Sequence, residues 1–360
     1  MKNLLFIIYL CFGIQTAVQA FGIRGFVDGA RDGAKVYLYV QGSLDAVALD
    51  SAVVKNGRFL IRHPGRLEFP LQCRLEINNT PDEVNRMKQE LKFYTCWIDN
   101  TEMILECPIG DMPDFREGSA KMANVRFTGS PTQDLYIEFI RAMQSMNKSL
   151  SEIGPAFIRT HRASVVSLSL AATILSLERS RLTLEEIDEL SVGFDVTLEK
   201  APLMGKMRKA AADARAVAKG IKYHDIELTT LDGRKVLLSE YVKSGQYNML
   251  EFWASYCGPC RAEIPHLKQL RQEYGDQTLH IISISTEMKP ESWKKAVREE
   301  GMDWPQLCNL KAKDNPVAQV YRIQGIPFCL VLDPEGKIVF GGNVRGKELD
   351  VQLKKLLGHL

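Results

Sequence analysis

The segment FWASYCGPCRAEIPHL, Phe252 to Leu267, places two cysteines two residues apart between an apolar run and an amphipathic segment. The preceding residues NMLEFWAS are typical of a buried strand, and PCRAEIPHLKQLRQEYG is typical of a helix. Cys257 therefore falls where a strand gives way to a helix, and Pro259 suits the first helical turn. A strand followed directly by a helix is typical of an α/β arrangement, and the dithiol lies at this junction.

The position of this dithiol predicts its chemistry. A thiol at a helix N-terminus faces unpaired amide N–H groups and the positive end of the helix dipole, which favour the thiolate. Because the thiolate is the nucleophile in thiol–disulfide exchange, we predict Cys257 as the attacking residue. Cys260, one helical turn later, is placed to attack the mixed disulfide and release the product. We expect this pair to be redox-active.

Two other interpretations of the Cys-x-x-Cys spacing are weaker. The spacing also occurs in half of a zinc site, but a second ligand pair at zinc spacing is missing and His266 stands alone. A purely structural disulfide would gain little stability from closing so small a loop. We therefore predict neither a metal nor another cofactor.

Two glutamates near the dithiol are candidate proton carriers. Glu251 interrupts the apolar run MLEFW, where burying a carboxylate is costly unless it is protonated or paired. A raised pKa would let Glu251 exchange protons with Cys260. Glu263, one turn beyond Cys260, is a second candidate. The alternatives are an exposed Glu251 on a peripheral strand and a Glu263 that is an ordinary surface residue.

Pro327 begins the predicted strand PFCLVLD, where a proline removes a hydrogen-bond donor from the ladder. A cis Ile326–Pro327 bond beside the dithiol would expose the backbone of Ile326 for pairing with an extended substrate. Only about 5% of X–Pro bonds in folded proteins are cis, so the residues alone do not choose this form.

The first twenty residues are predicted to be a secretory signal peptide. Lys2 precedes an apolar run from Leu4 to Ile14, and Val18 and Ala20 occupy the positions expected for cleavage after Ala20. The run is too short for a comfortable membrane span, and an uncleaved anchor is the alternative. We expect export to the periplasm or cell envelope.

The rest of the chain changes pattern twice. Residues 21–129 contain short alternating stretches, with a hairpin turn at Asn56-Gly57, and predict a small all-β sandwich or barrel. Residues 130–219 are helical in pattern, with Ser130 and Thr183 as caps and a last helix that ends at Gly220. Residues 220–360 alternate strands and helices and predict an α/β sheet covered on both faces.

Net charge and cysteine content limit the classes of function that the chain can have. Lys and Arg number 46 against 44 Asp and Glu, so no charge excess indicates a nucleic-acid partner. Of eight cysteines, Cys11 leaves with the signal, and an odd number remains, too sparse for a disulfide scaffold. Outside the dithiol, pairing is left open for Cys73, Cys96, Cys107, Cys308 and Cys329.

FWASYCGPCRAEIPHL, together with YRIQGIPFCLVLDPEGKIV, resembles the thioredoxin superfamily, specifically the TlpA/ResA-like exported thiol–disulfide oxidoreductases. The resemblance covers about Ile221 to Leu360. It implies a thioredoxin fold with Cys257 as nucleophile, Cys260 as resolving thiol and Pro327 as the cis-proline. It also implies that Glu251 is the buried acid and that Glu263 is an active-site glutamate.

Further residues follow from the same resemblance. Pro265 matches the proline that kinks the active-site helix. Trp253 and Tyr256, beside the dithiol, are assigned to substrate binding together with Ile326 and Pro327. Phe328 departs from the family, which has a small hydroxyl residue after the cis-proline, and Cys329 adds a thiol. The β-rich start and helical arm resemble an uncharacterised region fused to many such proteins, and imply no activity.

These features predict an enzyme that reduces or isomerises disulfides of exported proteins and is recharged by a membrane thiol-transfer protein. A thiol peroxidase on the same fold is the first alternative, but Ala254 stands where its hydroxyl residue is needed. The second is a partner-binding module on a redox-inactive scaffold.

Overall fold

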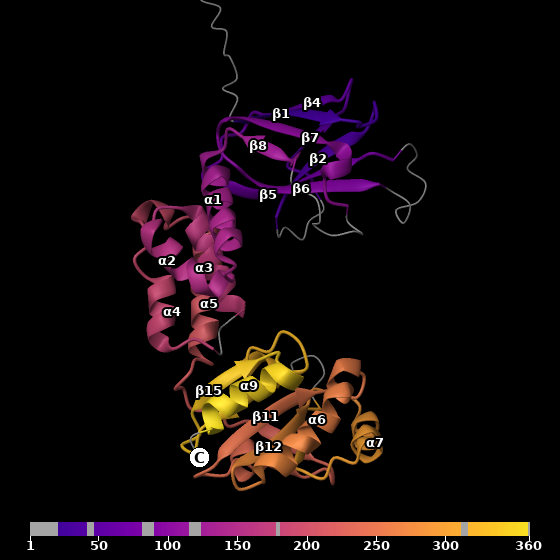
Figure 1. The fold of residues 1–360 in the computed structure, drawn as a ribbon, viewed down its shortest axis with the longest axis vertical. Helices are drawn as coiled ribbons and strands as arrows, with labels where there is room; N and C mark the ends of the chain where they lie inside the picture. Colours follow the sequence, from indigo (N-terminus) through magenta and orange to yellow (C-terminus); the bar gives the residue numbers. More distant parts are fainter. Residues whose placement is uncertain are drawn as a thin grey trace, which may run out of the picture. The chain divides into compact units, whose positions relative to one another are not determined.

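The computed structural model describes residues 21–41, 47–80, 90–114, 124–177, 181–310 and 316–358. The chain forms two compact units, Met1–Asn147 with Ser164–Val166 and Lys148–Ala163 with Ser167–Leu360 (Figure 1). The predicted signal peptide, residues 1–20, lies outside the described residues. The predicted domain boundaries after residues 129 and 219 stay predictions.

The first unit contains two four-stranded sheets, with strand orders β4-β1-β7-β8 and β3-β2-β5-β6. Buried and exposed residues alternate along most strands, and the inward side chains of both sheets share one core. The predicted β-rich domain is thereby confirmed. The strands are β1 (Phe21–Asp28), β2 (Lys35–Val40), β3 (Asp50–Val53), β4 (Arg58–His63), β5 (Leu71–Asn78), β6 (Leu91–Ile98), β7 (Glu102–Pro108) and β8 (Arg126–Thr128).

Two local predictions in this unit are confirmed. Asn56 and Gly57 form the predicted turn, with φ angles of 52° and 66° that suit a type I′ turn. Ser130 caps α1 (Pro131–Met146), because its Oγ accepts the backbone N–H of Gln133 at 3.0 Å. Gln133 in turn accepts the backbone N–H of Trp97 at 2.8 Å, which attaches α1 to β6. A short helix, η2 (Ile109–Asp111), follows β7.

The second unit begins with the helical region. Thr183 caps α4 as predicted, since it exchanges hydrogen bonds of 2.7 and 3.2 Å with Glu186. The predicted end of the last helix at Gly220 is wrong, because the helix ends at Arg215 and Lys219 donates its N–H to Leu182 instead. The helices are α2 (Leu150–Thr160), α3 (Val165–Leu177), α4 (Leu184–Ser191), η4 (Val196–Leu198) and α5 (Pro202–Arg215).

A seven-stranded mixed sheet follows, in the order β10-β9-β13-β12-β11-β14-β15. Its central strands β11, β12 and β13 are parallel, and β14 and β15 form the predicted antiparallel hairpin. Its strands are β9 (Glu227–Thr230), β10 (Lys235–Leu237), β11 (Tyr247–Trp253), β12 (Leu279–Ser285), β13 (Gln306–Cys308), β14 (Phe328–Leu332) and β15 (Ile338–Gly342). The short strands β9, β10 and β13 were not predicted.

Helices cover both faces of this sheet, as predicted. Side chains of α6, α7 and α9 share one core with one face, and α8 and η5 contribute to the core on the other. These helices are η5 (Leu238–Glu240), α6 (Gly258–Tyr274), α7 (Pro290–Glu300), α8 (Pro316–Val320) and α9 (Gly346–Leu357). Within the described residues, the structure contains no helix of the length and apolarity that crossing a membrane requires.

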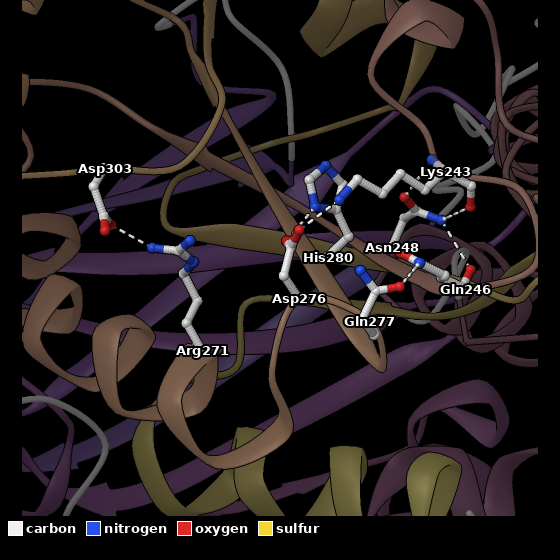
Figure 2. Close-up of polar contacts among 8 residues, drawn as sticks. All are labelled: Lys243, Gln246, Asn248, Arg271, Asp276, Gln277, His280 and Asp303. Carbon is white, nitrogen blue, oxygen red and sulfur yellow. Dashed lines mark hydrogen bonds and ion pairs between the residues drawn. The ribbon is translucent and has the colours of Figure 1, made fainter.

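Hydrogen bonds and ion pairs connect the loops that precede β11 and β12. Figure 2 shows Asp276 between Lys243 and His280, at 2.5 and 2.6 Å from their nitrogen atoms. Asn248 donates to the carbonyl oxygens of Lys243 and Gln246 at 2.8 and 2.9 Å. These contacts secure the loops before both strands, at the end opposite the dithiol.

Candidate active site

Cys257 and Cys260 are joined by a disulfide at the start of α6. Cys257 is the N-cap residue, and its Sγ accepts the backbone N–H of Cys260 at 3.2 Å. The side chains differ in access, because Cys257 is 7% exposed and Cys260 is 0% exposed. When the bond is reduced, the helix dipole and this N–H favour a thiolate on Cys257, the more accessible of the two.

Glu251 is buried on β11, with only 5% exposed. It alternates with Met249 and Trp253, so it points to the same face of the sheet as the core beneath α6. Burial raises the pKa of Glu251 to about 8, while a 2.7 Å hydrogen bond from Ser283 lowers it and the charge of Glu263 raises it. A carboxyl group in this range can exchange protons near neutral pH.

Glu263 is part of a polar cluster rather than an isolated surface residue. Its Oε1 lies 2.7 Å from Nδ1 of His266 and accepts the backbone N–H of Gly346 at 2.9 Å. The other ring nitrogen of His266 lies 2.8 Å from Asp350. The cluster therefore connects the first turns of α6 with the start of α9.

The Ile326–Pro327 peptide bond is cis. The pairing of Phe252 with Phe328 places this bond at the end of β11 from which the dithiol loop departs. Ile326 also packs against the core that contains both cysteines. The predicted cis-proline and the dithiol thus share one end of the sheet.

The two departures from the family pattern point to opposite faces of the sheet. Phe328 packs with Phe252 and Tyr321, away from the dithiol. Cys329 lies opposite Glu251 in the register and shares a core with the dithiol. Burial, with the charge of Glu251, raises the pKa of Cys329 to about 12. Cys329 is therefore a poor nucleophile in the folded protein.

The two predicted aromatic contacts differ sharply in exposure. Tyr256 is 70% exposed beside Cys257, whereas Trp253 is 1% exposed inside the core. The indole N–H of Trp253 is buried and has no hydrogen-bond partner among the residues described. Their roles in substrate binding stay predictions, with Tyr256 presented to solvent and Trp253 packed beneath the site.

Sequence patterns did not single out two residues that support the site. The side-chain amide of Asn343 donates to the carbonyl oxygens of Gly325 and Pro327 at 3.0 and 2.9 Å, so it holds both ends of the cis-proline segment. Buried Glu287 accepts the N–H and hydroxyl of Ser255, in the loop before the dithiol. No local motif marks either residue, because their partners come from distant parts of the chain.

A surface hollow of about 390 Å³ adjoins the site. It lies between the first turns of α6 and the segment from β15 to α9, with Pro259, Glu263, Asn343 and Arg345 in its lining. Pro259 in its lining lies between the two cysteines in sequence, and Asn343 holds the cis-proline segment.

Two family models match separate parts of the chain. Residues 220–340 match the AhpC/TSA family, and residues 21–136 match a domain of unknown function, DUF4369. Thiol-disulfide oxidoreductase ResA of Bacillus thuringiensis is 24% identical over 130 residues, 36% of this chain and 71% of that protein. ResA of Halalkalibacterium halodurans is 28% identical over 128 residues, 36% of this chain and 70% of that protein.

Solved structures also match part of the chain. The thioredoxin domain of a thiol-disulfide oxidoreductase from Bacteroides vulgatus is 33% identical, with 39% of this chain and 98% of that chain covered and a TM-score of 0.35. A thiol:disulfide interchange protein from Bacteroides sp. is 32% identical, with 40% and 92% covered and a TM-score of 0.36.

The sheet, the dithiol at the start of α6 and the cis-proline define a thioredoxin-like domain, as expected. Sequence identity places this domain more narrowly. Residues 220–340 are a thioredoxin-like domain that matches the AhpC/TSA family and is similar to ResA-type thiol-disulfide oxidoreductases, and the β-rich domain before it matches an uncharacterised family.

Proposed function

We propose that this protein reduces or isomerises disulfides of exported proteins through Cys257 and Cys260. The observation that carries the proposal is the unequal exposure of Cys257 and Cys260 at the start of α6. Glu251, a buried acid with a raised pKa, lies on the same side of the sheet. An accessible attacker, a shielded resolver and a proton carrier are the groups that disulfide exchange requires.

The reaction uses these residues in sequence. The Cys257 thiolate attacks one sulfur of the client disulfide, forming a mixed disulfide and releasing the other client sulfur as a thiolate, which takes up a proton. Glu251 accepts the proton of Cys260, whose thiolate then attacks Cys257. The second client sulfur leaves as a thiolate and takes the proton held by Glu251, and the Cys257–Cys260 disulfide remains. The client gains two electrons and the dithiol loses two.

Client binding is assigned to the surface around the dithiol. The backbone of Ile326, before the cis-proline, pairs with an extended client segment, and exposed Tyr256 contacts client side chains. Asn343 supports this arrangement because it holds the carbonyl oxygens of Gly325 and Pro327. Glu263 acts as a second proton carrier, with His266 holding its carboxylate.

Export and recharging complete the proposal. The amino-terminal pattern with Lys2 and the apolar run directs the chain to the periplasm or cell envelope. A reductase in an oxidising compartment must receive electrons, so a membrane thiol-transfer protein serves as its donor.

The decisive experiment is a redox titration of the dithiol with Cys257→Ser and Cys260→Ser as controls. We expect a potential near about −270 mV, as in thioredoxin, with no couple in either variant. A value near about −120 mV would reverse the direction of electron flow. Absence of a reversible couple would instead favour the partner-binding alternative, and peroxide consumption that exceeds disulfide reduction would favour the peroxidase.

A further inference from the structure

The core of the first unit contains a second pair of cysteines. β5 and β6 are antiparallel, and their register sets Cys73 directly opposite Cys96. Both side chains point into the core, with 0% and 1% exposed, and both are free thiols. The disulfide exchange described above uses neither of them.

The spacing of this pair is close to that of a disulfide. Directly opposed residues of an antiparallel pair have Cβ atoms about 4.5–5.5 Å apart, and a disulfide needs about 3.5–4.5 Å. A bond between Cys73 and Cys96 therefore requires the two Cβ atoms to approach by about 1–2 Å, without a change of register or of the buried face.

The backbone hydrogen bonds between β5 and β6 show whether Cys73 and Cys96 are a hydrogen-bonded or a non-hydrogen-bonded pair. Asn79 donates its N–H to the carbonyl oxygen of Glu90 at 3.0 Å, in continuation of the same register. Hydrogen-bonded pairs alternate along an antiparallel ladder, and Asn79 lies an even number of residues from Cys73. Cys73 and Cys96 are therefore a hydrogen-bonded pair, with Cα atoms about 5.5 Å apart, inside the range that disulfides adopt.

We propose that Cys73 and Cys96 form a second thiol–disulfide site, a strained cross-strand disulfide that is easily reduced. The two thiols lose two protons and two electrons as one S–S bond forms. The disulfide of an oxidant, such as oxidised glutathione, accepts them and becomes two thiols. Because the strands must approach within an intact ladder, the bond is strained, and strained disulfides are the labile and regulatory ones.

Burial determines when this bond can form. Burial raises the pKa of Cys73 to about 12 and, with the charge of Cys73, raises the pKa of Cys96 well above its ordinary value. The folded pair thus holds little thiolate at neutral pH and reacts slowly. Oxidation is expected during folding or when the strand pair opens. Oxidation of this pair in the cell rests on the proposed export to an oxidising compartment, whereas its oxidation in solution does not.

Cys107 provides a matched control within the same core. It lies on β7 in the opposing sheet, and its side chain is 5% exposed. Packed sheets lie about 10 Å apart, beyond the about 7 Å between Cα atoms that a disulfide spans. Cys107 therefore shares the burial of Cys73 and Cys96 without a bonding partner across the sandwich.

The test is to refold the reduced full chain in oxidised glutathione, trap remaining thiols with an alkylating reagent, and map disulfides by mass spectrometry. We expect a Cys73–Cys96 linkage in the unsubstituted chain, in Cys107→Ala and in the double variant Cys257→Ser/Cys260→Ser. Cys73→Ala should lack it. The linkage should also open at a reduced-to-oxidised glutathione ratio at least tenfold lower than the Cys257–Cys260 bond.

The result that overturns the proposal is trapping of Cys73 and Cys96 as free thiols under every oxidising condition, or their linkage to other cysteines. Equal or greater resistance to reduction than Cys257–Cys260 would overturn its labile character. Because the disulfides are mapped in the unsubstituted chain, this test does not depend on whether any variant folds. The double variant separates this outcome from the proposed enzymatic function, because it lacks the Cys257–Cys260 dithiol.

Discussion

Nδ1 of His266 lies 2.7 Å from Oε1 of Glu263, three residues earlier on the helix that begins with the dithiol. Asp350, from α9, meets the other ring nitrogen at 2.8 Å. The imidazole thus lies between two carboxylates, and one of them is a proposed proton carrier. His266 therefore connects α6 to α9 through contacts whose strength depends on the protonation of its ring.

His266→Gln should reduce stability most at low pH. Burial lowers the pKa of His266, but hydrogen bonds and charges from Glu263 and Asp350 outweigh it and raise the pKa overall. The stabilising contribution is therefore present below the unfolded-state pKa of about 6.5 and is lost as pH rises through the folded-state value. We expect a loss of about 1 kcal/mol at pH 6 by urea unfolding, shrinking toward pH 8.5. Wild-type and variant stability curves that stay parallel over this range would contradict the prediction.

Glu251→Gln should become more stable than the wild type as pH rises. The folded-state pKa of about 8 exceeds the ordinary value of 4.5, so folding retains a proton that the unfolded chain releases between these values. Wild-type stability should therefore fall by up to about 1.4 kcal/mol per pH unit in this window, relative to Glu251→Gln. Urea unfolding at pH 5, 6.5 and 8 measures the difference, and a constant difference would show that the group does not titrate there.

The same substitution should slow catalysis. If Glu251 accepts the proton of Cys260, release of the client from the mixed disulfide should slow roughly 10- to 100-fold at pH 7. Formation of the mixed disulfide by Cys257 should change much less. Stopped-flow measurement of both steps with a model disulfide separates them, and equal slowing of both would point to a general structural effect.

Asn343→Ala should weaken client binding without changing the potential of the dithiol. The substitution removes both hydrogen bonds to the cis-proline segment, at 3.0 and 2.9 Å, so Ile326 is held less firmly. We expect roughly a 3- to 10-fold rise in KM for a protein disulfide, equivalent to about 1 kcal/mol, with kcat nearly unchanged. Lys347→Ala, at an exposed position nearby, serves as control. A shifted potential would place the effect on the dithiol instead.

Tyr256→Ala should separate protein clients from small disulfides. Because Tyr256 is 70% exposed, its removal should alter stability by less than about 0.5 kcal/mol. Reduction of a protein disulfide should slow several-fold, while reduction of a small aromatic disulfide reagent remains near the wild-type rate. Val351→Ala, with 50% exposure on α9, is the comparison for loss of an exposed apolar group. Equal effects on both substrates would argue against a contact with the client.

Much of the fold and dithiol could be predicted because their signals are local. An apolar strand, a helix start and Pro259 occupy a few consecutive residues around Cys257, and caps such as Ser130 are equally short-range. The short strands β9, β10 and β13 were missed because three or four residues carry little periodicity. The helix expected to reach Gly220 ended earlier because Lys219 pairs with a distant carbonyl.

The chemistry expected of the dithiol can be predicted from one short segment, since a Cys-x-x-Cys at a helix start carries its activation in adjacent backbone atoms. The groups around the dithiol and in the β-rich core, by contrast, are brought together by the fold of each domain. Ser283 reaches Glu251, Asp350 reaches His266 across 84 residues, and Cys96 faces Cys73 through strand register. Such contacts depend on how strands align and helices pack over the whole domain, and no short segment of the chain encodes that alignment.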